Sequence, residues 1–144
     1  PFTKGPVQSA GYILNAGSEQ FIQDCVHKLQ QDHAASLLIF PEGTRTAKGE
    51  QLNDFQRGAA NIALRAGVPI RPVLISCTPS TLTKNEKWYH IPEQPFHIHV
   101  KVLDAIRVED VLDDVTVNPK NVRQLNQQLQ WFFNQELSLN EQSC

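Results

Sequence analysis

The feature that most constrains this chain is an alternation between short continuous apolar runs and stretches with helical periodicity. Residues 37–40 and 68–76 are nearly unbroken apolar runs, which is typical of strands that are buried on both faces. Residues 18–32 and 55–66 instead repeat their apolar residues at helical spacing. Strands that alternate with helices of about a dozen residues favour a parallel sheet covered by helices. We therefore expect an α/β fold with a mostly parallel sheet flanked by helices.

Two further elements are predicted in the C-terminal half. Residues 96–102 alternate strictly between apolar and polar side chains. This pattern predicts an edge strand with one buried and one solvent-exposed face, and the strand could pair antiparallel with its neighbour. Asn118 and Pro119 have the order of a helix cap and a first helical residue. We expect a C-terminal helix after them, and a first short strand at residues 11–14.

Composition and charge exclude several classes of protein. The chain has 144 residues, of which 40% are apolar and 19% are charged, and this suits one folded domain. A net charge of -2 argues against a general nucleic-acid binder. No apolar run approaches the roughly 20 residues that a membrane span needs. The three cysteines fit neither a disulfide framework nor a zinc pattern. Because the chain has no Met and begins with Pro1, we expect it to be part of a longer protein.

Residues 40–46, Phe-Pro-Glu-Gly-Thr-Arg-Thr, form the most informative motif. They follow an expected strand, and ligands of open α/β sheets bind at that end of the strands. Gly43 allows the backbone to turn, and the guanidinium of Arg45 suits a phosphate or carboxylate. Glu42 could hold Arg45 in place or accept a hydrogen bond from a hydroxyl. The alternative is an ordinary turn with a solvated Glu-Arg pair.

Three blocks in order resemble the glycerolipid acyltransferase superfamily, of the lysophosphatidic acid acyltransferase type. The first is the Glu-Gly-Thr-Arg block at residues 42–45. Residues 55–60 resemble the Phe-Lys-x-Gly-Ala helix entry of that family, with Gln56 where Lys is usual, and residues 68–73 resemble its Val-Pro-Ile-x-Pro-Val block. Residues 11–13 are similar to its Gly-x-Ile strand, although the usual arginine is missing. The similarity covers about residues 11–76.

The resemblance implies an O-acyltransferase and a location for its acceptor. In that family an acyl group passes from a thioester of coenzyme A or acyl carrier protein to a hydroxyl, typically of a lysophospholipid. It implies that Arg45 pairs with the acceptor's phosphate, that Glu42, Gly43 and Thr44 shape the pocket, and that Arg57 shares it. No cofactor is implied. We expect the full protein to act at the cytoplasmic face of a membrane, this chain itself to be soluble, and nucleic acid not to be a partner.

The catalytic His-x4-Asp block of the family has two apparent matches in this chain, and neither fits. His27 and Asp32 lie within one predicted helix, where five residues turn through about 500° and the two side chains diverge by about 140°. His99 and Asp104 follow the Glu-Gly-Thr-Arg block instead of preceding it, and an odd separation along a strand places them on opposite faces. We expect no catalytic residue in this chain. It would supply the C-terminal two-thirds of an acyltransferase domain.

Two other functions stay open from the sequence: a non-enzymatic anion-binding or interaction domain on the same scaffold, and an acyltransferase with a non-glycerolipid acceptor. A metal site is not expected, because His97 and His99 share a strand face without an evident third ligand. Residues 42–75 carry five basic and three acidic side chains, a local excess that suits an anionic acceptor. Arg65 is expected to point to water and Cys25 to be buried.

Overall fold

The described residues form three α-helices, one short 3-10 helix and two strands. The computed structural model describes residues 19–32, 34–46, 50–81, 83–84, 89 and 94–141. In chain order the elements are α2 (Glu19–Gln31), α3 (Gly58–Ala66), β1 (Val73–Thr78), β2 (His97–Val102), η1 (Val108–Asp110) and α4 (Pro119–Glu141). The strand predicted at residues 11–14 and the first residue of the helical stretch predicted at residues 18–32 lie outside the described residues.

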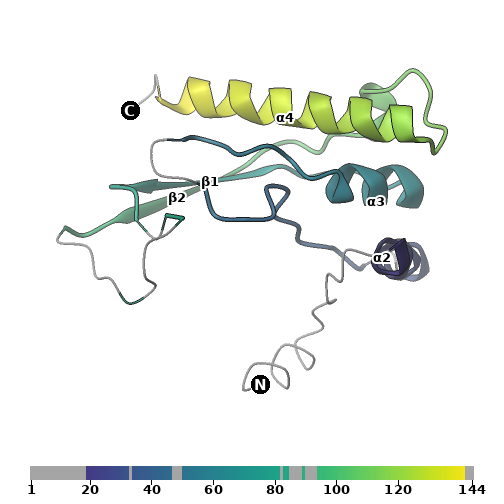
Figure 1. The fold of residues 1–144 in the computed structure, drawn as a ribbon, viewed down its shortest axis with the longest axis horizontal. Coiled ribbons are helices and arrows are strands. Elements are labelled where there is room, and N and C mark those ends of the chain that lie inside the picture. Colours follow the sequence, from purple (N-terminus) through teal and green to yellow (C-terminus); the bar gives the residue numbers. More distant parts are fainter. Residues whose placement is uncertain are drawn as a thin grey trace.

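Helix α3 lies at the centre of the fold, with α2 on one side and α4 on the other (Figure 1). The long α4 runs beside both α3 and the β1–β2 pair. The core is built mainly where α3, η1 and the apolar stripe of α4 meet, and its buried members are Phe55, Ala60, Ala63, Leu64, Val108, Leu112, Val122, Leu125 and Leu129. Helices α3 and α4 therefore share one core.

The start of α4 is capped as predicted. The Asn118 side-chain oxygen accepts a hydrogen bond from the backbone N–H of Asn121 at 2.8 Å, which satisfies one of the free donors of the first turn. The side-chain Nδ2 of Asn121 in turn donates to the Asp114 carboxylate at 3.1 Å. Hydrogen bonds from Thr116, and then from Asn121, hold the pKa of Asp114 below its ordinary value. The long helix thus begins at a fixed point on the core.

Helix α3 begins three residues later than predicted and ends as predicted. The backbone N–H groups of Phe55 and Gln56 are used outside the helix, by the Gln130 side chain and the Pro41 carbonyl respectively. Gly67 closes the helix with φ of 65°, and its N–H donates to the Ala63 carbonyl at 2.9 Å. That left-handed conformation is the reason for glycine at this position.

The prediction of a mostly parallel sheet is wrong for the described residues. Their sheet has two strands, β1 and β2, which pair antiparallel with Val73 opposite Val102. Residues 37–40 belong to no strand or helix, and Leu38 and Phe40 are 78% and 68% exposed. An apolar run indicates that a segment tends to leave water, but it does not specify the backbone with which the segment pairs.

The alternation predicted for residues 96–102 is present, but the burial of its faces is not as expected. On the face toward α4, Leu74 is buried and Lys101 forms an ion pair with Glu136 of α4 at 3.2 Å. The opposite face carries the cross-strand pairs Ile75–Val100 and Cys77–Ile98, and Ile75, Ile98 and Val100 are more than half exposed. The polar face meets α4 because Glu136 supplies the carboxylate for the Lys101 ammonium.

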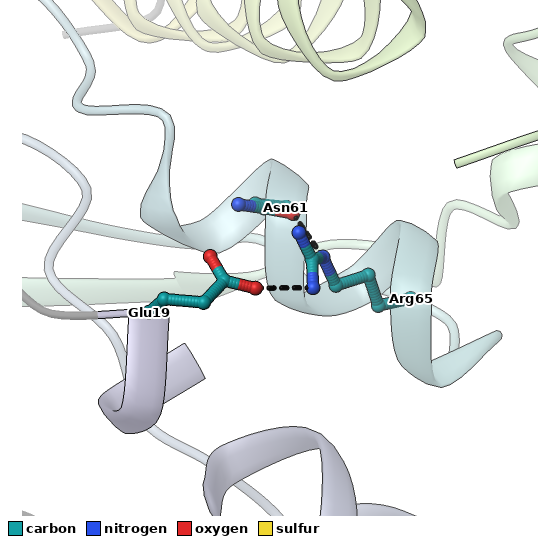
Figure 2. A network of polar contacts seen from close by, with 3 residues as sticks. All are labelled: Glu19, Asn61 and Arg65. Atoms are coloured by element: carbon teal, nitrogen blue, oxygen red, sulfur yellow. Dashed lines mark hydrogen bonds and ion pairs between the residues drawn. The ribbon is translucent and has the colours of Figure 1, made fainter. Parts of the chain in front are cut away.

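Helices α2 and α3 are joined by a polar network (Figure 2). Arg65 donates through Nη1 to Glu19 Oε1 at 2.5 Å and through Nε to Asn61 Oδ1 at 2.8 Å. The prediction that Arg65 points to water is therefore wrong, since Glu19 lies within its reach across the helix pair. One of the five basic side chains near the motif is thereby neutralised. No helix in the described segments is long and apolar enough to cross a membrane.

Replacing Leu125 by Ala should lower the free energy of unfolding by about 2–5 kcal/mol, because a fully buried leucine leaves a cavity in the core. Leu139 on the same helix is 56% exposed and serves as the control. Its replacement by Ala should cost less than about 0.5 kcal/mol. Denaturant unfolding of both variants measures the difference, and equal losses would contradict the proposed core.

Candidate functional site

The Glu-Gly-Thr-Arg motif lies in a tight turn after residues 35–40, which form no helix or strand. The Gly43 N–H donates to the Phe40 carbonyl at 3.1 Å, and Gly43 has φ of 68°. A side chain added at this position would place its Cβ 3.3 Å from Cγ of Gln56. Glycine is needed here for two reasons: the left-handed backbone and the close approach of Gln56.

The Glu42 carboxylate anchors this turn to the segment that precedes α3. Glu42 Oε2 accepts a hydrogen bond from the backbone N–H of Asn53 at 2.7 Å and another from the Thr46 hydroxyl at 3.1 Å. An ionised acceptor strengthens both bonds. Glu42 thus accepts a hydroxyl hydrogen bond from within the chain, donated by Thr46. Asn53 was not predicted to take part.

Two more hydrogen bonds join the same segments. The Gln56 N–H donates to the Pro41 carbonyl at 2.7 Å, and the Asn53 side-chain amide donates to the Arg45 carbonyl at 3.3 Å. Three hydrogen bonds, donated by Asn53 and Gln56, therefore join residues 41–46 to residues 53–57. We call these two segments the paired loops.

The paired loops present four of the five predicted site residues to solvent. Gly43, Thr44, Arg45 and Arg57 are exposed, whereas Glu42 is half-buried. Arg57 occupies the cap position of α3, directly after the residue that binds the Pro41 carbonyl. Two exposed guanidinium groups on fastened segments, next to a helix N-terminus, form an arrangement that can receive a phosphate or a carboxylate.

The other sequence candidates are placed elsewhere. His27 is exposed on α2 and Asp32 follows the end of that helix, while His99 lies in β2 and Asp104 comes after it. Within the described segments no group of three or more His, Cys, Asp or Glu side chains could hold a metal. Cys25 is fully buried as predicted, and its burial, with a smaller effect of Asp24, raises the pKa of the thiol. These groups do not join the paired loops.

Comparisons with known proteins agree with the motif. A family model described as Acyltransferase matches residues 14–76. The chain is 36% identical over 86 residues to 1-acyl-sn-glycerol-3-phosphate acyltransferase alpha of Mus musculus, which covers 59% of this chain and 29% of that protein. It is 46% identical over 50 residues to the 1-acyl-sn-glycerol-3-phosphate acyltransferase of Escherichia coli. That match covers 35% of this chain and 20% of the Escherichia coli protein. The chain thus spans less than a third of these relatives. No solved structure matches it.

Replacing Glu42 by Ala should release the turn, because the Asn53 N–H and the Thr46 hydroxyl both lose their acceptor. We expect the free energy of unfolding to fall by about 1–3 kcal/mol. The amide of Asn53 should also exchange its hydrogen faster, which NMR can follow. The matched control is Glu50→Ala, since Glu50 is exposed in the segment between the paired loops. If both variants behaved alike, Glu42 would not be an anchor.

Proposed function

Because residues 14–76 of this chain match the family model described as Acyltransferase, we propose that the full-length protein transfers an acyl group from a thioester to the hydroxyl of a lysophospholipid. The thioester is one of coenzyme A or of acyl carrier protein. The hydroxyl oxygen forms a bond to the thioester carbonyl carbon and the carbon–sulfur bond breaks. The hydroxyl proton leaves through a general base, and the products are an ester and a thiol.

In this proposal the paired loops bind the phosphate of the acceptor. The observation that carries it is the set of hydrogen bonds that hold Arg45 and Arg57 on two segments fastened to each other. The Arg45 guanidinium donates to the phosphate oxygens, and Arg57 contributes a second positive charge. Glu42 fixes the turn, and Gly43 and Thr44 form its surface.

The electrostatic surroundings favour an anion. Residues 42–75 have a net charge of +2 within a chain of net charge -2, although Arg65 is neutralised by Glu19. The N-terminus of α3 directly follows Arg57, and its peptide dipoles add a partial positive charge. A phosphate with two negative charges would be attracted to this part of the surface in preference to the acidic remainder.

The general base is proposed to lie in the part of the protein that precedes this sequence. The family's His and Asp occupy such a block, and neither His27 with Asp32 nor His99 with Asp104 precedes the motif at the family's spacing. This chain then supplies the acceptor-binding part of a single acyltransferase domain, and alone it should not transfer acyl groups. A membrane surface holding the lipid acceptor is the proposed partner of the full-length protein, at its cytoplasmic face.

Replacing Arg45 by Ala in the full-length protein should raise the KM for lysophosphatidic acid about 10- to 100-fold, because a charge-assisted contact to phosphate is lost. Arg45→Lys should recover only part of the affinity, since an ammonium group lacks the planar pair of donors. Steady-state kinetics with a fixed acyl thioester measure both variants.

The control for this experiment is Arg123→Ala, because Arg123 is an exposed arginine on α4. Its KM should equal that of the wild type. If Arg45→Ala left the KM unchanged and lowered the melting temperature instead, Arg45 would have a structural role and the phosphate proposal would fail. An anion-binding protein without enzymatic activity would bind lysophosphatidic acid through Arg45 but turn over no thioester.

A further inference from the structure

Helix α4 directs two side-chain amides at the backbone of a single residue, Phe55. Asn126 Nδ2 donates to the Phe55 carbonyl at 3.0 Å, and the Phe55 N–H donates to Gln130 Oε1 at 3.1 Å. Phe55 precedes α3 and belongs to no helix or strand. Its backbone groups are therefore satisfied by side chains of α4 instead of a neighbouring peptide unit.

The contact extends beyond these two bonds. Gln130 Nε2 donates to Asp54 Oδ1 at 3.2 Å, so the Gln130 amide uses both its oxygen and its nitrogen. The ring of Phe55 packs edge-on against Phe133 of α4, with ring centroids 5.2 Å apart. Asn126 is buried, with 9% exposure, and a buried amide without a partner would be costly. Asn126, Gln130 and Phe133 of α4 therefore all contact residues 54–55.

This stretch is the part of the paired loops that holds the motif. Asn53, two residues before Phe55, donates its N–H to Glu42, and Gln56, the next residue, donates to the Pro41 carbonyl. Residues 53–57 can fix the Glu-Gly-Thr-Arg turn only if they are themselves fixed. The bonds from α4 to Asp54 and Phe55 supply that support.

From this chain of contacts we infer that Asn126 and Gln130 are positioning residues for the acceptor site. They act through Phe55 and Asn53 on the turn that carries Arg45, and they do not touch the substrate. The inference rests on the proposed function, and it concerns a helix outside residues 14–76, which the family model matches. According to this inference, α4 positions the paired loops in addition to packing in the core.

The physical basis is the population of the binding-competent loop. Without the amides of α4, residues 53–57 would sample other conformations, and the turn would be held correctly for only a fraction of the time. The apparent dissociation constant rises in inverse proportion to that fraction. Loss of a buried hydrogen bond corresponds to roughly a three- to tenfold change in such an equilibrium.

The test uses Gln130→Met and Asn126→Leu in the full-length protein, because each keeps the approximate size of the side chain and removes its hydrogen bonds. We expect the KM for lysophosphatidic acid to rise roughly three- to tenfold and kcat to stay near the wild-type value. Hydrogen exchange measured by mass spectrometry should become faster in residues 50–57 and remain unchanged in the interior of α3. The control is Gln127→Met, an exposed glutamine of the same helix, which should alter neither quantity.

The outcomes separate this inference from the proposed function. Faster exchange in residues 50–57 together with a raised KM supports the inference. If Arg45→Ala raises the KM but both α4 variants match the Gln127→Met control, the inference is overturned and the proposed function stands. If the wild type transfers no acyl group, the proposed function fails, and the exchange measurement alone then decides whether α4 positions the loops. Should Asn126→Leu not fold, the half-buried Gln130 decides.

Discussion

The arrangement of this molecule depends on the polar backbone of residues 53–56, which lies between α3 and α4 without belonging to either. Such a segment is stable away from water only if its N–H and carbonyl groups find partners. Glu42 satisfies Asn53, the Pro41 carbonyl satisfies Gln56, and the amides of Asn126 and Gln130 satisfy Phe55. The same bonds hold the motif turn, the start of α3 and the long C-terminal helix in one unit.

Local signals predicted the helices well and the sheet poorly. The cap at Asn118 and the stop at Gly67 involve groups a few residues apart, so the sequence pattern contains both partners. Strand pairing joins distant segments, and the apolar run at residues 37–40 carries no information about its partner. The same is true of β2: its alternation was predicted, but the choice of face depends on Glu136, which lies 35 residues from Lys101.

The motifs that define the candidate site can be recognised in the sequence, but the contacts that support the site cannot. Glu42, Gly43, Thr44, Arg45 and Arg57 belong to motifs that can be recognised in the sequence, and the paired loops bring these segments together. Asn53 and Gln130 have no such signal, since Gln130 contacts a residue 75 positions away. The sequence indicates this support only through the many Asn and Gln residues of α4, and such residues are normally solvated. Polar support of this kind becomes visible only in three dimensions.

The central claim is that the paired loops receive a phosphate group, and an NMR titration of this chain with glycerol 3-phosphate tests it most directly. The account predicts that chemical shifts change at the backbone amides of residues 43–46 and 56–58, and that sulfate at the same ionic strength competes for the same amides. Residues of α2 should show no change, because α2 lies on the other side of α3 from α4 and carries none of the paired loops. Changes confined to α2, or no change at the paired loops up to millimolar concentrations, would contradict the account.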